Sequence, residues 1–323
     1  MRNVFFAIFL SLSSVYGDPT PVVNPAPTGP WLTGPLIAPI PTVIPRGHTE
    51  IQYYLYVTTN TGTYDSHWNS HSQPNLCSVN PQIPCFFGLT DWMDIQITPQ
   101  ALYNFSQDKA SIHLGDTPIG FDFQLYPADD KRQWLPGIKF TLREIFPTGK
   151  YQKLDPNKNG TQLSGAGSFG TNGGLVFYKV FHFKGDHYLS TLLNLGGTLF
   201  APVHVKGFNN YGGGYHTSGK VRPGVSSTAI FSFEYTFTQN WVFALDSVYV
   251  HTNKNKFSGN PGVTVAGDVA SVGNPSSEQI SFAPAIEYNF SANFGIIAGA
   301  WVTACGRNTT QFRSGVINFD VNY

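Results

Sequence analysis

The stretch Gly315-Val-Ile-Asn-Phe-Asp-Val-Asn-Tyr323 decides the fold, because apolar and polar residues alternate along it up to the last residue. The apolar residues occupy every second position, at Ile317, Phe319, Val321 and Tyr323; we call such a set of alternate residues a parity of the strand. Successive side chains of a β-strand point to opposite faces, so this strand has one apolar and one polar face. The apolar face would pack on a second sheet in a soluble β-sandwich, or would meet lipid in a membrane barrel.

The same alternation recurs in a series of segments separated by turn-forming residues, which predicts an antiparallel meander. The expected strands are 47–58, 91–100, 118–126, 137–146, 173–183, 188–200, 228–237, 241–252, 278–290, 294–305 and 315–323, with weaker candidates at 203–208 and 215–222. Long polar connections (59–90, 147–172, 209–223 and 253–277) alternate with short turns (184–187, 238–240 and 291–293). This asymmetry is typical of a barrel. We therefore predict an all-β fold, a transmembrane antiparallel β-barrel of about 12 strands, over residues 48–323.

Composition supports this class. Charged residues make up 12% of the chain, about half the usual share, while aromatic residues make up 15%. Beyond residue 17 no window approaches 18 uninterrupted apolar residues, which excludes helical membrane spans. The formal net charge is zero and no run of basic residues occurs, so nucleic acid is not an expected partner.

The amino-terminal region predicts secretion followed by a leader. Residues 1–17 combine a positive start, a short apolar run and small residues before Gly17, which is typical of a cleaved signal peptide. Residues 18–47 hold nine prolines, so we expect an extended leader that does not join a sheet. The leader could be a periplasmic tail or could fold back into the barrel lumen, and the tail is the simpler interpretation.

The polar parity of several predicted strands carries charge, at Asp122, Lys139, Arg143, Glu234, Asp246 and Glu287. A Lys or Arg on the lipid face costs roughly 2–4 kcal/mol at mid-bilayer, so we predict that these residues line the lumen. They would border a conducting path or form salt bridges that fill a narrow barrel. The candidates for the aromatic girdles, at or near strand ends, are Trp92, Trp134, Trp241 and Trp301.

The cysteines and histidines give weaker signals. An oxidising compartment would permit a disulfide between Cys77 and Cys85, with Cys305 left over. The cysteine spacing makes no metal site, and no cofactor is expected. Asp65, His67 and His71 form a loose cluster in a loop. Such histidines are usually solvated, and we predict no metal there.

Three further motifs are interpreted as structural. Gly165-Ala-Gly-Ser-Phe-Gly170 matches the dinucleotide fingerprint GxGxxG, but no helix is predicted after it, as that site requires. The segment 155–160 opens like a calcium loop, yet the position of the bidentate acid falls on Ala166. His113 and His216-Thr-Ser218 lack the surroundings of an activated nucleophile, so no enzymatic activity is predicted.

Three stretches of the central third are Phe87-Gly-Leu-Thr-Asp-Trp-Met-Asp-Ile95, Gly137-Ile-Lys-Phe with Phe146-Pro-Thr-Gly-Lys150, and Gly165-Ala-Gly-Ser-Phe-Gly170. Together they resemble the outer-membrane family named for the meta-pathway of phenol degradation, which is similar to channel-type transporters of hydrophobic compounds. The resemblance implies transport across the outer membrane and supplies no catalytic residues. The proline-rich leader and the loop with Cys77 and Cys85 are not part of that family's pattern.

These observations predict a passive outer-membrane channel or transporter of a Gram-negative bacterium for small solutes, hydrophobic or aromatic ones among them. The alternative is a structural or adhesive surface barrel that displays loops 59–90 and 253–277, and an outer-membrane enzyme comes third. The expected partners are outer-membrane lipid, lipopolysaccharide and the barrel-assembly machinery. The last would recognise the terminal strand, which resembles an assembly signal at Ile317, Phe319, Val321 and Tyr323.

Overall fold

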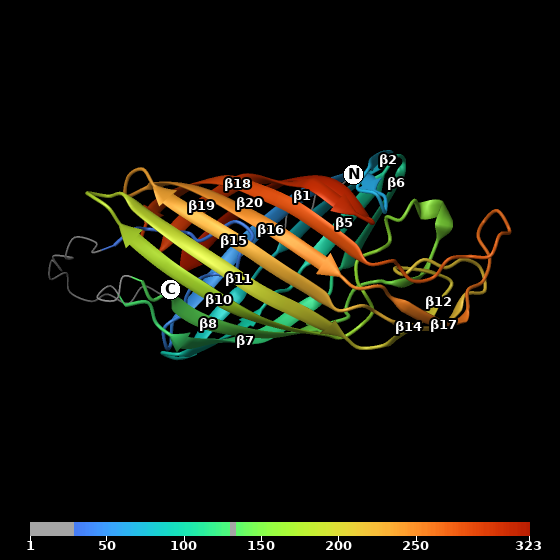
Figure 1. The fold of residues 1–323 in the computed structure, drawn as a ribbon, viewed down its shortest axis with the longest axis horizontal. Helices are drawn as coiled ribbons and strands as arrows, with labels where there is room; N and C mark the ends of the chain where they lie inside the picture. The colour runs from blue at the N-terminus through green and yellow to red at the C-terminus, as the bar shows by residue number, and fades with distance from the viewer. Residues whose placement is uncertain (1–28, 130–133) are drawn as a thin grey trace, which may run out of the picture.

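The computed structural model describes residues 29–129 and 134–323, so the predicted signal peptide and residues 18–28 lie outside the described residues. One antiparallel sheet closes on itself as a barrel, because the last strand pairs with the first (Figure 1). Its twelve wall strands follow one another in chain order, each beside the next: β1 (Thr49–Tyr64), β3 (Cys85–Thr90), β4 (Met93–Ile97), β7 (Thr117–Tyr126), β8 (Gly137–Phe146), β10 (Gly170–His182), β11 (Tyr188–Phe200), β15 (Ser226–Thr236), β16 (Trp241–Thr252), β18 (Ser277–Ser291), β19 (Phe294–Arg307) and β20 (Thr309–Asn322). The predicted fold and strand number are confirmed.

The alternation read from the sequence sorts side chains between the two faces of the wall. On β15, Ile230, Ser232 and Glu234 are buried inside, whereas Phe231 between them is 49% exposed on the outer face. On β20, Asn318 is buried and Phe319 is exposed. The wall is therefore apolar outside and largely polar inside, as lipid around a closed barrel requires.

At one end of the barrel, the short-turn end, neighbouring strands are joined by tight connections such as 183–187 and 237–240. The exposed indoles of Trp92, Trp134 and Trp241 lie in or beside connections at this end, at the positions expected of a girdle. Trp301 does not belong to this group. Trp301 is one of the alternate residues of β19 whose side chains point inward. Its Nε1 donates to Ser281 Oγ at 2.9 Å, and its ring packs on Phe312.

The opposite, long-loop end is more ordered than the sequence predicts. Residues 59–90, expected to be a polar loop, instead continue β1 and form β2 (Ser70–Gln82) and β3, with a turn at 65–69. A second hairpin, of β5 (Ala101–Ser106) and β6 (Lys109–Leu114), pairs with β2. β2 ends before Pro84 and β4 ends before Pro99, and neither proline has a backbone N–H to donate to the ladder.

The remaining outer connections fold over one another into a small layer with its own apolar core. Its elements are β9 (Gln152–Leu154), η1 (Pro156–Lys158), β12 (Val203–Lys206), β13 (Phe208–Asn209), β14 (Ser218–Arg222) and β17 (Lys256–Asn260). The order β12–β14–β17 repeats that of β11, β15 and β16 below, and β9 pairs with β13. Within the described residues, η1 is the only helical turn, and no helix is long and apolar enough to cross a membrane.

The predicted disulfide is wrong. Cys77 lies on β2 and Cys85 on β3, and both thiols are free, as is that of Cys305. The two cysteines are eight positions apart along one extended run, which separates their Cα atoms by roughly 26 Å at about 3.3 Å per residue. A disulfide requires Cα atoms within about 7 Å, so spacing that would suit a loop does not suit a strand.

Candidate functional site: an acidic lumen filled by the leader

Residues 29–44 of the leader run through the barrel interior, so the predicted periplasmic tail is wrong for this part of the leader. Carboxylates of the inner wall accept hydrogen bonds from its backbone amides: Thr33 N to Glu287 Oε2 (3.0 Å), Ile37 N to Asp246 Oδ2 (2.7 Å) and Ile44 N to Asp94 Oδ2 (2.8 Å). Irregular backbone away from water must find such partners. The acidic side chains on the inner face of the wall are these partners.

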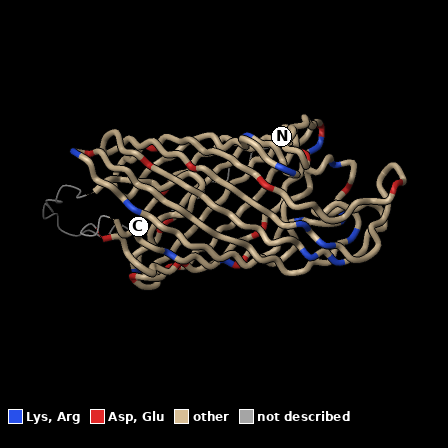
Figure 2. Tube along the Cα trace, in the orientation of Figure 1, with Lys and Arg blue, Asp and Glu red and all other residues tan. Residues whose placement is uncertain are grey.

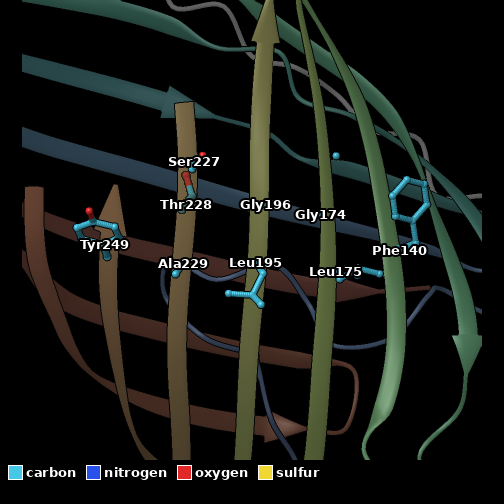
Figure 3. A pocket seen from close by; sticks show the side chains of 10 residues that line it. Phe140, Gly174, Leu175, Leu195, Gly196, Ser227, Thr228, Ala229 and Tyr249 are labelled. Carbon is cyan, nitrogen blue, oxygen red and sulfur yellow. The ribbon is translucent and has the colours of Figure 1, made fainter. Parts of the chain in front are cut away.

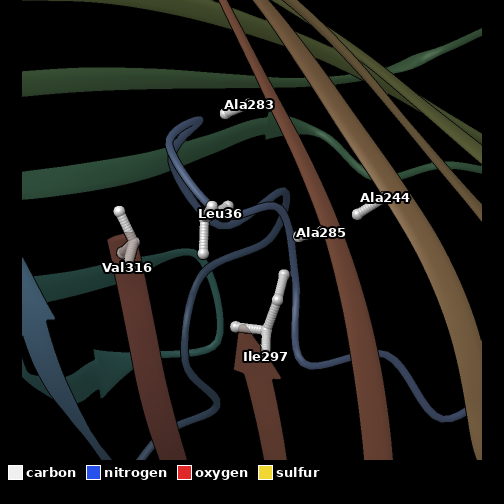
Figure 4. Packing of buried hydrophobic residues seen from close by; sticks show 6 residues of the cluster. All are labelled: Leu36, Ala244, Ala283, Ala285, Ile297 and Val316. Atoms are coloured by element: carbon white, nitrogen blue, oxygen red, sulfur yellow. The ribbon is translucent and has the colours of Figure 1, made fainter. Parts of the chain in front are cut away.

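Leu36 is the apolar anchor of the leader and is 1% exposed. It fills a recess of small side chains and packs on Ala244, Ala283, Ala285, Ile297 and Val316 of the inner wall (Figure 4). Gly299 completes the recess: a Cβ added there would lie 2.9 Å from the Leu36 side chain and 2.4 Å from Pro284 O. Small inward residues on β16, β18 and β19 thus make room for one leucine from a distant part of the chain.

Three of the predicted lumen residues form one ion-pair cluster. Lys139 Nζ lies 2.8 Å from Asp122 Oδ2, and Arg143 Nη2 lies 3.1 Å from Asp122 Oδ1. Lys139 and Asp122 are fully buried, and Lys139 Nζ also donates to Thr42 O of the leader at 3.4 Å. The cluster therefore helps to hold the leader, and Arg143 at its edge also lines a cavity between the leader and the wall.

The other three, Glu234, Asp246 and Glu287, are also buried inside, and none of the ion pairs within the described residues includes them. Glu234 lines a small cavity of about 130 Å³ together with Glu50 and Asp320 and part of the leader. The inner wall is therefore rich in buried carboxyl groups. Glu50 and Asp94 are two further buried carboxyl residues of the inner wall that were not among the predicted lumen residues, although the alternation indicates that they point inward.

A larger cavity of about 340 Å³ remains between the leader and the wall. Its surface mixes aromatic groups, such as Tyr54, Tyr56 and Phe86, with polar groups such as Arg143 and Asn194. Cavities of roughly 150 Å³ already accommodate benzene, so this space is sufficient for a single aromatic ring.

The outer face of the same wall carries an apolar groove of about 550 Å³ (Figure 3). Leu175, Leu195, Phe140 and Tyr249 border it, and Gly174, Gly196 and Thr228 line both the groove and the inner cavity. The wall there is one backbone layer thick. It is nevertheless closed, because Gly174 pairs with Gly196 and Gly196 with Thr228 in the β-ladders.

The glycine-rich motif and the calcium-like segment both have structural roles. The glycines of 165–170 lead into β10 without a helix, and Asp155 caps η1 by accepting from Asn157 N at 2.9 Å. His71 Nε2, at the start of β2, lies 3.0 Å from Asp65 Oδ2 of the hairpin turn. In the described part of the chain no group of three or more His, Cys, Asp or Glu side chains is arranged to hold a metal ion.

The long-loop layer is fixed above the cavity by buried contacts. Tyr211 Oη donates to Ala166 O at 2.9 Å, and burial raises the pKa of Tyr211 to about 12, with Asp116 contributing. Asp116 in turn accepts from the amides of Gly149 (2.9 Å) and Ala166 (2.7 Å). The outer connections are therefore held to the rim of the wall.

Comparison with known proteins shows the fold. No protein-family model matches the chain, and no curated protein matches it. Among solved structures, it is similar to the COG4313 outer membrane channel from Pseudomonas putida F1, with a TM-score of 0.66 and 14% identity over 88% of this chain and 98% of that one. Weaker likenesses are the transport unit of the autotransporter AIDA-I from Escherichia coli (TM-score 0.43, 11% identity, 84% and 89% covered) and a mutant of the TodX monoaromatic hydrocarbon channel (0.42, 13%, 87% and 91%).

The fold therefore defines a class: the chain is a closed antiparallel barrel of the outer-membrane type. In this chain the wall carboxylates bind the chain's own leader inside the lumen.

Proposed function

We propose that this chain is a passive outer-membrane channel for small solutes, hydrophobic or aromatic ones among them, and that it carries no enzymatic activity. The observation that supports the proposal best is the cavity of about 340 Å³ between the leader and an inner wall that offers both aromatic rings and polar groups. An apolar outer face and a shared fold with a solved outer-membrane channel are consistent with that location. Membership of the phenol meta-pathway family is part of the same proposal.

The axial route requires the leader to move. The segment that holds Leu36 and Ile37 lies against the cavity, and carboxylate bonds tie its amides to the wall. Each of these hydrogen bonds contributes about 0.5–1.5 kcal/mol net, so together they favour the docked leader. Solute binding in the cavity would open the path to the extent that it favours the displaced leader.

A lateral route is the second candidate. Solute would pass from the inner cavity to the outer groove across the glycine-lined wall, where only backbone separates the two spaces. It would have to break the ladder between Gly174 and Gly196, which is intact. The axial route breaks side-chain contacts of one irregular segment and leaves the sheet whole, and we therefore place it first.

The test is conductance and solute flux of the refolded full chain in a planar bilayer and in liposomes. We expect small, infrequent openings for the full chain and large, stable steps after deletion of residues 29–47. Heat-modifiable electrophoretic mobility verifies that each protein is folded. A folded, inserted deletion variant that neither conducts nor passes a phenol-sized neutral solute would refute the channel and would favour a surface barrel that displays its outer loops.

A further inference from the structure

The β12–β14–β17 sheet presents one strongly basic face. His204 and Lys206 on β12, Lys220 and Arg222 on β14, and Lys256 on β17 are all exposed; we call these five residues the basic face. The alternate residues of the same strands, among them Val203, Val205 and Val221, are buried in the apolar core of the layer. The period of two therefore separates an apolar back from a basic front.

The pairing of the strands brings these charges together. Lys220 lies directly opposite His204, and Arg222 lies directly opposite Lys256. Side chains opposite each other in a sheet are about 4.5–5.5 Å apart at Cβ, so the like charges of Arg222 and Lys256 destabilise their pair. The three strands contain no Asp or Glu, and none of the ion pairs in the described residues includes the basic face.

The basic face points away from the mouth of the barrel. The apolar back of the sheet packs on Tyr151 and Tyr211, and Tyr151 belongs to the 147–169 connection. That connection also lies against the buried face of the hairpin formed by β5 and β6. There, Asn104 Nδ2 donates to Thr161 O (3.1 Å) and Leu163 O (2.8 Å). The connection thus fills the space between the two parts of the rim, and the basic face is left on the outside. Figure 2 shows Lys and Arg gathered over β12, β14 and β17, in the orientation of Figure 1.

We propose that the basic face binds the phosphate groups of lipopolysaccharide in the outer leaflet around the barrel. This inference rests on the proposed outer-membrane location but not on conduction. An arginine fork beside a lysine suits a phosphate, which accepts several charge-assisted hydrogen bonds at once. An anion between Arg222 and Lys256 would also remove the repulsion that the pairing creates. Phosphates are the anions that such a membrane concentrates beside its proteins.

The experiment measures binding of the full refolded protein in detergent to lipopolysaccharide with intact phosphates and to the same material after chemical dephosphorylation. The test variant is Lys220→Glu with Arg222→Glu. The control, Arg46→Glu with Lys184→Glu, makes the same charge change at exposed residues of the short-turn end. Lys220→Gln with Arg222→Gln replaces the test variant if that variant does not fold by heat-modifiable mobility.

We expect the wild type and the control to bind phosphorylated lipopolysaccharide alike, and the test variant to bind at least about tenfold more weakly, since each basic residue near an anionic surface contributes about fivefold. Dephosphorylation should weaken wild-type binding to a similar extent. Equal binding by test and control variants, or binding that is indifferent to phosphate, would overturn the proposal. A test variant that alters only the flux of anionic solutes would also overturn it. Conductance of the same samples reports on the channel separately, so either proposal can fail alone.

Discussion

Replacing Leu36 by alanine should loosen the leader and leave the barrel intact. The Leu36 side chain is 1% exposed and fills a recess of the inner wall, so its truncation removes buried apolar contacts and leaves a cavity. Truncations of this kind cost about 2–5 kcal/mol. Because the wall strands keep their own ladders, we expect this cost to fall on docking of the leader.

A loss of 2 kcal/mol increases the undocked fraction by a factor of about thirty, and 5 kcal/mol increases it by more than a thousandfold. Single-channel recording should therefore show a matching rise in open probability, and limited proteolysis should cut the released leader. The matched control is Leu193→Ala, which truncates a leucine that is 37% exposed on the outer face. If Leu36→Ala and Leu193→Ala show the same open probability and the same leader cleavage, the leader does not gate the lumen.

Three further predictions test the charges and the two faces of the wall. Lys139→Met leaves its buried aspartate partner without its closest cation, so urea unfolding in detergent should show a loss of about 3–5 kcal/mol, and a loss under 1 kcal/mol would contradict the buried pair. The hydrogen bond from His71 holds the pKa of Asp65 well below its usual range, so His71→Ala should raise that pKa in a carboxyl NMR titration. Because the folded pKa is depressed, the stabilisation is present at neutral pH and is lost only as the pH falls through the acid range; an unchanged titration would contradict the assignment. Leu193→Lys on the outer face should cost roughly 2–4 kcal/mol of folding free energy in lipid vesicles, whereas Val269→Lys in an exposed loop should cost almost nothing, and equal costs would mean that lipid does not cover the outer face.

The wall was predictable because its signal is local. Alternation places Phe319 outside and Asn318 inside without reference to any other segment. The observed bounds of three strands, 137–146, 188–200 and 241–252, are those that the pattern predicts. The inward positions of all six charged residues follow from the same period. What alternation cannot reveal is what an inward side chain meets, so Lys139 was expected beside a path and instead lies in a buried ion pair.

Contacts between distant segments escaped prediction. The polar sequence of 59–90 has the composition of a loop, and it becomes a hairpin because β1 and β5 provide partners on both sides. The free cysteines follow from that extension. Likewise, no run of basic residues occurs in the sequence; the basic face exists only because β12, β14 and β17 align residues from two separate connections.

The sequence by itself determined the closed, lipid-facing barrel, because strand period, turn chemistry and low charge are properties of neighbouring residues. Only the tertiary structure decided that the leader occupies the lumen. A proline-rich segment has no periodicity that selects a partner. Its position depends on amides that meet carboxylates between 50 and 254 residues away, as Thr33 meets Glu287, and on one leucine that packs into a recess of small side chains. Those contacts exist only once the barrel has closed around them.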